Sequence, residues 1–445
     1  MLQVFEEELE FPVIPGHRDL LSYLGTMVRN HLPAGLLPVR FVVTATTANR
    51  YRCELGVVSG LLDEQLKHTC SIFDYAPRVT ENTASFNAVL LVPTGIGSII
   101  GGHAGDANPV ARLLASVCDT LITHPNVVNA SDINDLPENG LYVEGSVITR
   151  VMMGISGLQP VRANRVLAVI DEHPDKMFIN IATNSVSAAR ASYGLQCPAV
   201  IRLDPPLYLK SVYAASGRAV GRVERLEGLI EVLEDYKGQY DALALSTQIE
   251  VPKNYHVDYY TARGAMINPW GGAEAILTHA ISSIYDIPAA HAPMLESQEI
   301  ADLDLGLVDP RMAAEEISNG FFICVLKGLQ RSPRLVKDVR QGNRPGVLTA
   351  SDISCLVIPD GCLGLPTLAA LEQAIPVIAV RENKNIMAND LSALPWGPGQ
   401  LHVVENYWEA AGVMSALKEG VDPNSVRRPL HDTVEVRRSN QELPG

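Results

Sequence analysis

Short apolar runs rich in Val, Ile and Leu recur along this chain and alternate with longer amphipathic stretches. The runs lie at residues 87–93, 120–125, 165–171, 178–183, 199–204, 241–247, 321–326, 355–359, 376–380 and 401–404. Such runs are typical of strands buried on both faces of a sheet. Helical patterns lie at residues 109–118, 184–194, 217–237, 272–285, 310–319, 364–374 and 406–418. The alternation predicts an α/β protein with parallel sheets covered by helices.

Two further patterns precede these runs near the start of the chain. Residues 17–31 predict an amphipathic helix, and the segments VRFVVTA and YRCELGVV, separated by the turn residues TTANR, predict a β-hairpin. A chain of 445 residues exceeds one ordinary core, so we expect two Rossmann-like domains with a cleft between them. The first covers residues 1–160 and holds a glycine-rich loop at 95–105. The second covers residues 161–445, and a subdivision near residue 250 stays open.

Composition excludes several classes of partner. The 35 Lys and Arg residues against 50 Asp and Glu leave a net charge of −15, which repels phosphate backbones, so we expect no nucleic-acid partner. The seven cysteines are never spaced as C-x-x-C, which is typical of a reducing compartment. The acidic start does not look like a signal peptide, and no apolar stretch reaches about 18 residues. We therefore expect a cytoplasmic protein with no membrane partner; assembly into a homo-oligomer is compatible with the sequence.

A glycine-rich loop in the segment VPTGIGSIIGGHAGDANPVARLLASVCD, residues 92–119, is the strongest functional signal. Its backbone N–H groups and the helix start that follows predict an anion site for a phosphate or carboxylate. Ile100 stands where the dinucleotide fingerprint has its third glycine, and no Gly-Lys-Ser/Thr follows, so neither common nucleotide motif is present. A glycine-rich turn without a ligand is the alternative. The predicted binding glycines are Gly95, Gly97, Gly101, Gly102 and Gly105.

Acid–base residues accompany this loop. His103 and Asp106 lie inside it, and His124 and Asn126 follow the next predicted strand. The carboxyl ends of adjacent parallel strands share one crevice, and imidazole titrates near neutrality. We predict His103, His124 and Asp106 as catalytic residues and Asn126 as a substrate ligand. Structural histidines are the alternative.

A second cluster is INPWGGAEAILTH, residues 267–279, in which Trp270, Gly271 and Gly272 are predicted to contact the ligand. Packing of the tryptophan on its own helix is the alternative. Glu274 and His279 are five residues apart, which does not place them on one helical face for a metal. Downstream, His291 and Glu296 add further acid–base groups, and Asp309 before Pro310 predicts a helix cap. No spacing in the chain identifies a metal or a cofactor.

A third cluster is CLVIPDGCLGLPTLAALEQAIPVIAVREN, residues 355–383, in which Asp360 and Gly361 end a predicted strand. The segment resembles the carboxyl-terminal half-motif of glycosyltransferases, which implies that its loop and helix hold the phosphates of a nucleotide donor. Cys362 at the helix start is either a nucleophile with a lowered pKa or a packing residue. We include Asp360 and Gly361 among the predicted ligand contacts.

The segments PTGIGSIIGGHAGDANP, THPNVVNASDIN, INPWGGAEA and PDGCLGLPTLAALE together resemble an uncharacterised family, a domain of unknown function found in cyanobacteria, plant plastids and other bacteria. The resemblance implies no established reaction. Our first hypothesis is an enzyme that acts on a small carboxylate- or phosphate-bearing metabolite by general acid–base catalysis in the interdomain cleft. The alternatives are a nucleotide-sugar-dependent transferase, which would bind a nucleoside diphosphate tightly, and a non-catalytic ligand-binding or regulatory protein, which would bind without turnover.

Overall fold

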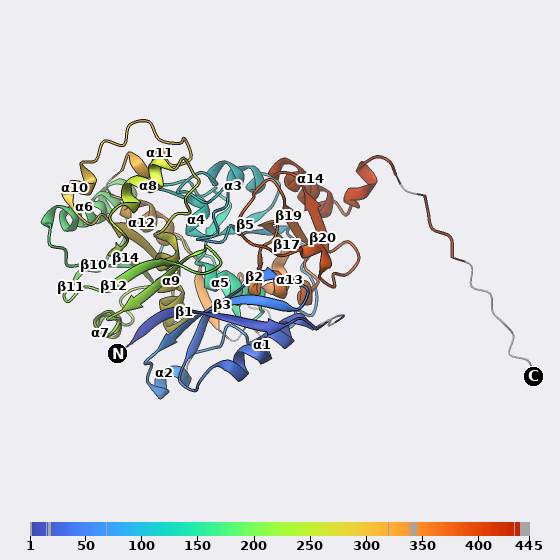
Figure 1. Cartoon of the computed structure of the whole chain (residues 1–445), viewed down its shortest axis with the longest axis horizontal. Helices are drawn as coiled ribbons and strands as arrows, with labels where there is room; N and C mark the ends of the chain where they lie inside the picture. The colour runs from blue at the N-terminus through green and yellow to red at the C-terminus, as the bar shows by residue number, and fades with distance from the viewer. Residues whose placement is uncertain are drawn as a thin grey trace, which may run out of the picture.

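The computed structural model describes residues 2–14, 16, 19–67, 69–318, 320–337, 339, 345–430 and 432–436 (Figure 1). It shows a mixed α/β protein in which a large curled sheet lies beside a separate parallel sheet. In Figure 1 the curled sheet extends from the left, at β10, β11, β12 and β14, to the lower centre, at β1, β2 and β3, and the parallel sheet is at the upper right. The predicted α/β class is therefore confirmed, whereas the expected pair of Rossmann-like domains is not confirmed.

The parallel sheet has the order β20-β19-β17-β4-β5-β8, and every neighbouring pair in it is parallel. Numbered among themselves along the chain, its strands follow the order 3-2-1-4-5-6 of a doubly wound sheet, whose direction of winding changes between β4 and β17. The prediction that residues 87–93 and 120–125 form neighbouring parallel strands is confirmed, and α3 (Asn108–Ala115) connects them. The bounds are β4 Asn87–Leu90, β5 Thr120–Thr123, β8 Gly140–Tyr142, β17 Ile353–Pro359, β19 Val377–Val380 and β20 Leu401–Val404.

The curled sheet has the order β11-β10-β14-β12-β13-β1-β3-β2-β18, with β15 paired to β14. Its β10, β11, β14 and β15 are parallel, and the part from β12 through β18 is antiparallel. The predicted hairpin is confirmed as β2 and β3. The bounds are β1 Gln3–Pro12, β2 Leu37–Thr46, β3 Arg50–Ser59, β10 Val166–Asp171, β11 Val200–Leu203, β12 Tyr208–Tyr213, β13 Ala219–Glu224, β14 Ala242–Glu250, β15 Ala289–Met294 and β18 Leu363–Gly364.

Helices and two small antiparallel ribbons complete the described chain. The ribbons pair β6 (Asn129–Ala130) with β7 (Ile133–Asn134), and β9 (Ser156–Gln159) with β16 (Arg334–Lys337). The remaining helices are α1 Leu20–His31, α2 Asp63–Lys67, α4 Pro125–Val128, α5 Gly145–Met152, α6 Lys176–Tyr193, α7 Glu227–Asp235, α8 Tyr255–Thr261, α9 Gly271–Tyr285, α10 Gln298–Ala301, α11 Ala313–Glu316, α12 Phe322–Gln330, α13 Leu365–Gln373 and α14 Tyr407–Lys418. Short 3-10 turns lie at Ala350–Asp352, Leu391–Ala393 and Pro423–Val426.

Several predicted elements are wrong. The run at 178–183 lies within α6, and all but the first residue of the run at 321–326 lies within α12. A short apolar run does not by itself distinguish a strand from a buried helix. A signal for α6 was present in Asp175, whose side chain caps the helix by accepting the N–H of Met177. The first part of the predicted helix 217–237 is strand β13, and only α11 forms within 310–319.

The sheets do not follow the expected division at residue 160. Strands β17, β19 and β20 come from the second predicted domain, yet they complete the sheet begun by β4, β5 and β8. The predicted helix at 17–31 begins at Leu20, and residues 17 and 18 lie outside the described residues. Within the described residues, no helix is both long enough and apolar enough to span a bilayer.

Candidate functional site

A cavity of about 360 Å³ lies where the two sheets meet, beyond the carboxyl ends of β4, β5 and β17. This is the point at which the winding of the parallel sheet changes direction, and open α/β sheets bind ligands at such points. The starts of α5, α9 and α13 also line the cavity, as do β2, β15 and several of the described residues at 295–318 and 320–321. The volume is within the usual range of small-molecule sites, roughly 300–1,000 Å³.

The glycine-rich loop lines one side of this cavity, although not with all its predicted residues. Gly95, Gly97, Gly101 and Gly102 line it, and Gly105 is not among the lining residues. Close packing within the protein requires at least two of these glycines. A Cβ at Gly102 would lie 2.1 Å from the carbonyl oxygen of Ser98, and Gly95 has a φ of +78° with Ala219 directly beside it.

Several backbone N–H groups of the loop already have protein partners. The N–H of Ile99 donates to the carbonyl of Lys384, and that of Ile100 donates to Asn383. Further along, Gly101 donates to Asp106 and Ala104 donates to Glu315. The expectation that the loop points unpaired N–H groups into the cavity is therefore wrong for these four residues.

His103 and Asp106 belong to the glycine-rich loop, but they do not line the cavity. The Nδ1 of His103 lies 2.6 Å from the hydroxyl of Tyr259 on α8, and burial, aided by the charge of Arg311, lowers the pKa of this histidine to about 4. Asp106 accepts the N–H of Gly101 at 2.8 Å, and burial raises the pKa of its carboxyl to about 7. The expectation that these two side chains line the cavity is wrong, and their catalytic roles stay predictions.

His124 and Asn126 do line the cavity, as predicted. The Nε2 of His124 accepts the N–H of Val92 at 3.1 Å, and burial lowers the pKa of the imidazole to about 4. The ring is therefore neutral at pH 7 and carries its proton on Nδ1, since Nε2 is the acceptor. Asn126 donates to the carbonyls of Val92 and Gly101, which joins the end of β5 to the loop after β4.

At the second predicted cluster, Trp270 and Gly271 line the cavity. Gly272 does not; a Cβ there would lie 2.4 Å from the carbonyl oxygen of Ala219, so this glycine permits α9 to pack on β13. Asn268, which the sequence analysis did not single out, accepts the N–H groups of Trp270 and Gly271 and so holds the start of α9.

At the third predicted cluster, Asp360 and Gly361 are not among the lining residues, whereas Cys362 is. The carboxylate of Asp360 accepts the N–H of Gly361 and thereby closes its own turn. Cys362 is buried, and burial raises the pKa of its thiol far above the usual range. A nucleophile needs the opposite shift, so this geometry favours the packing alternative. The predicted cap at Asp309 accepts from Arg311 and lies in a turn before α11.

Three carboxylate–imidazole pairs, which the sequence analysis did not assemble, also line the cavity. In the first, Glu144 pairs with Nδ1 of His279. In the second, Glu274 pairs with Nδ1 of His291 at 3.1 Å, and in the third Glu296 lies 3.4 Å from Nε2 of His256. The partners are 135 residues apart in the first pair, 17 in the second and 40 in the third. Sequence spacing alone therefore could not identify them as pairs.

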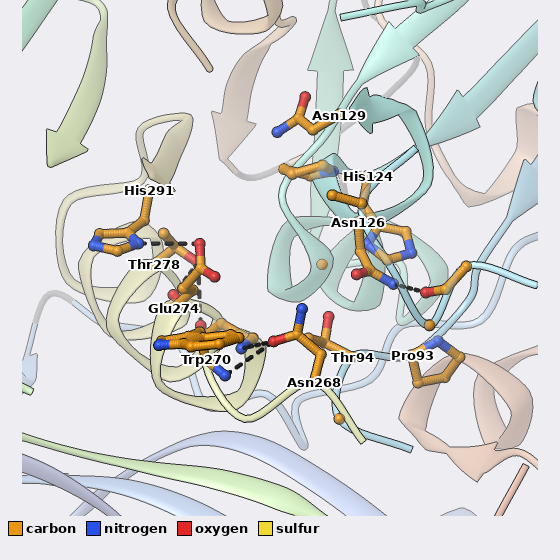
Figure 2. A pocket seen from close by; sticks show the side chains of 18 of the residues that line it. Pro93, Thr94, His124, Asn126, Asn129, Asn268, Trp270, Glu274, Thr278 and His291 are labelled. Carbon is orange, nitrogen blue, oxygen red and sulfur yellow. Dashed lines mark hydrogen bonds and ion pairs between the residues drawn. The ribbon is translucent and has the colours of Figure 1, made fainter. Parts of the chain in front are cut away.

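The Glu274 pair extends into a chain of three groups. Nε2 of His291 lies 2.8 Å from the hydroxyl of Thr247 within β14, so both ring nitrogens have partners. Glu274 lies in the first turn of α9, where the helix dipole stabilises its negative charge. Figure 2 shows Glu274, Thr278 and His291 on one side of the cavity and His124, Asn126 and Asn129 on the other.

Two other carboxylates of the cavity have shifted acidities. Glu144 is the N-cap of α5; burial opposes its charge, but His279 and the N-terminal N–H groups of the helix outweigh this and lower its pKa. Glu315 on α11 accepts the N–H of Ala104, and burial raises the pKa of its carboxyl to about 7. Among the described residues, no group of three or more His, Cys, Asp or Glu side chains is placed to hold a metal ion.

The family model for "Protein of unknown function (DUF3326)" matches residues 87–427. The chain belongs to this family. The DUF3326 match begins at β4 and includes all three carboxylate–imidazole pairs, and it leaves out β1, β2 and β3.

The chain is also 34% identical over 345 residues to a protein of Synechococcus sp. named as an uncharacterized lipoprotein. The aligned part covers 76% of this chain and 92% of that protein. No solved structure matches the chain at a significant level. The cytoplasmic location stays a prediction.

Proposed function

We propose that this protein is an enzyme that transfers a proton on a small carboxylate- or phosphate-bearing metabolite bound in the cavity. The observation that carries the proposal is the chain Glu274–His291–Thr247, which ends at the cavity wall. A carboxylate oriented by an imidazole, which is itself oriented by a hydroxyl, is an arrangement suited to general acid–base catalysis.

Within this chain, Glu274 is the group placed to exchange a proton with the substrate. Its side chain is 26% exposed, whereas the side chain of His291 is fully buried. His291 and Thr247 therefore act as positioning residues, because the buried ring of His291 holds the carboxylate and Thr247 holds the ring. Glu274 replaces His103 and Asp106 in the role that the sequence analysis had proposed for them.

His124 supplies a complementary group on the opposite wall. Its Nε2 is occupied by the N–H of Val92, which leaves the Nδ1 proton as a donor. A neutral imidazole with a low pKa stabilises a developing oxyanion by hydrogen bonding and does not lose its own proton in doing so. We assign to His124 this donor role in place of the general acid or base role predicted from the sequence.

We place the anionic group of the metabolite at Arg40 and the start of α13, which line the same cavity as Glu274. Arg40 on β2 lines the cavity there together with Gly364 and Leu365 at the start of α13. The N-cap of α13 is Gly364, which provides no side-chain cap, and a helix N-terminus favours negative charge. Arg40 shares its charge with Glu6 at 3.1 Å, and so it supports an anion only in part.

The test uses Glu274→Gln, which keeps the size of the side chain and removes its basicity. Purified protein is incubated in D2O with a fraction of small metabolites from a bacterial extract, and mass spectrometry follows both consumption and deuterium uptake. We expect the variant to lower the rate for the responding metabolite about 10²- to 10⁴-fold, the usual contribution of general acid–base catalysis. Glu231→Gln on the exposed face of α7 is the matched control and should leave the rate unchanged.

Two results would contradict the proposal. Equal turnover in wild type and Glu274→Gln would remove this carboxylate from the chemistry. Binding of a metabolite with neither consumption nor deuterium uptake would favour the non-catalytic, ligand-binding alternative.

A further inference from the structure

The part of α9 that borders the cavity carries an acid–base group at each edge. The residues of this helix that line the cavity are Gly271, Glu274, Ala275, Thr278 and His279. At about 100° per residue, Glu274 and His279 lie at the two edges of this set, roughly 140° apart around the helix axis and about 7.5 Å apart along it. Between them are only a glycine, an alanine and a threonine. A molecule on this part of α9 therefore has an acid–base group on each side.

His279 has a ring nitrogen that is free to exchange a proton. Its Nδ1 is held by Glu144, and its Nε2 has no hydrogen-bond partner among the described residues. The side chain is 14% exposed, and a Cβ built on Gly145, which also lines the cavity, would lie 3.8 Å from Nε2. In contrast, Nε2 of His124 accepts a backbone N–H, and both ring nitrogens of His291 have partners.

Glu144 is itself held firmly and so fixes the imidazole of His279. Its side chain is 3% exposed, and one oxygen accepts the N–H groups of Ser146 and Val147 and the hydroxyl of Ser146. The other oxygen faces Nδ1 of His279. A fixed carboxylate at Nδ1 orients the ring and stabilises the imidazolium that forms when Nε2 takes up a proton.

We infer that Glu274 and His279 act on opposite sides of one carbon atom of the substrate and that the protein is an epimerase. The inference rests on the proposed function, in which Glu274 exchanges a proton with the bound metabolite. The substrate class is a small anionic carbonyl compound with a hydrogen-bearing stereocentre beside the carbonyl. Its anionic group lies at Arg40 and its carbonyl oxygen at His124.

The reaction consists of two proton transfers. The C–H bond breaks, its proton goes to Glu274, and its electron pair forms an enolate whose oxygen accepts the Nδ1–H of His124. A new C–H bond then forms on the opposite side of the carbon with the Nε2 proton of the His279 imidazolium. Glu274 has gained one proton and His279 has lost one, and exchange with water restores both. The reverse reaction uses the same groups in exchanged roles and, like the forward one, needs no oxidant, reductant or second substrate.

The experiment measures inversion and hydrogen exchange separately. Stereochemically pure aldose and ketose phosphates of four to six carbons are incubated in D2O with the full chain; chromatography follows inversion, and mass spectrometry follows deuterium in each epimer. We expect wild type to invert at least one member, with one solvent deuterium at the inverted carbon. His279→Gln should lower the rate of inversion about 10²- to 10⁴-fold and still exchange the epimer whose C–H faces Glu274. Glu274→Gln should also lose inversion and exchange only the other epimer.

Two further variants test the support of the imidazole. Glu144→Gln keeps an oxygen acceptor for the start of α5, and it should slow exchange on the His279 side and leave exchange on the Glu274 side unchanged. Equal loss on both sides would contradict this positioning role. His31→Gln is the matched control, because His31 lies 3.9 Å from Glu7 and its side chain is 50% exposed; this variant should keep both rates.

Failure of the inference and failure of the proposed function give different results. Inversion at the wild-type rate in His279→Gln, shown to be folded by circular dichroism, overturns only the inference. Wild-type exchange without inversion of any member, or conversion of an aldose to a ketose in place of inversion, also overturns only the inference. Equal exchange in wild type and Glu274→Gln contradicts the proposed function itself.

Discussion

Replacing Glu315 by Gln should make the protein more stable at alkaline pH relative to wild type. Glu315 is 7% exposed, and its Oε1 accepts the N–H of Ala104, which attaches the glycine-rich loop to α11. The side-chain amide of Asn268 lies 3.4 Å from the same oxygen. Glutamine keeps an oxygen acceptor for these donors and cannot ionise, so the substitution isolates the cost of the buried negative charge.

The size of the effect follows from the shift in acidity. Burial raises the pKa of Glu315 from 4.5 to about 7, so between these values the folded protein binds more protons than the unfolded chain. The contribution of this group to stability is therefore greatest below pH 4.5 and is lost as the pH increases to 7. At about 1.4 kcal/mol for each pKa unit, the loss is about 3 kcal/mol.

The measurement is urea unfolding of wild type and Glu315→Gln at pH 5, 6, 7 and 8, with the free energy of unfolding extrapolated to water. We expect the difference between variant and wild type to change by about 2–3 kcal/mol in favour of the variant from pH 5 to pH 8. Glu231→Gln controls for the loss of a glutamate on an exposed helical face. A difference that is the same at pH 5 and pH 8 would refute the reasoning, because it would mean that Glu315 does not titrate with a raised pKa in the folded protein.

Two other substitutions test the groups around the cavity. Burial lowers the pKa of His124 from 6.5 to about 4, so the folded protein loses stability as the pH falls from 6.5 to 4. In the same unfolding assay, His124→Gln should therefore lose about 2–3 kcal/mol less stability than wild type between pH 7 and pH 4. An equal loss of stability in wild type and variant would contradict a buried neutral ring. Arg218 is fully buried between Glu6 and Glu54, so Arg218→Met leaves two buried carboxylates without this partner and should cost about 3–5 kcal/mol. Arg222 on β13 is 53% exposed, so Arg222→Met should cost less than about 0.5 kcal/mol. Equal unfolding midpoints for the two variants would contradict this expectation.

Local sequence pattern predicted some elements because their signals are short-range. The β2–β3 hairpin follows from two apolar runs around a turn, and the β4–α3–β5 unit follows from two buried strands with a proline at the helix start. The same reasoning failed for α6 and α12. Strands were predicted for these segments because a buried helix and a buried strand have the same apolar composition over six residues.

The candidate site was predictable only in part. His124, Asn126, Trp270 and Gly271 were singled out from the sequence, and all four line the cavity. They were found because each follows a predicted strand or begins a predicted helix, positions from which side chains reach the edge of a sheet. His103 shared that signal, but α8 places Tyr259 against it and so turns it away from the cavity.

The sequence by itself determined the α/β class, the glycine-rich loop after β4 and the polar residues at the ends of β4 and β5, because these depend on neighbouring residues. Only the tertiary structure decided that β17 completes the sheet beside β4 and that Glu274 meets His291 and Glu144 meets His279. The physical reason is that these contacts join residues far apart in the sequence; the two carboxylate–imidazole pairs, for example, require α9 to pack against β15 and α5. Such packing depends on the burial of many side chains that are distant in the sequence. Each apolar face, taken alone, could be buried equally well against another helix or sheet.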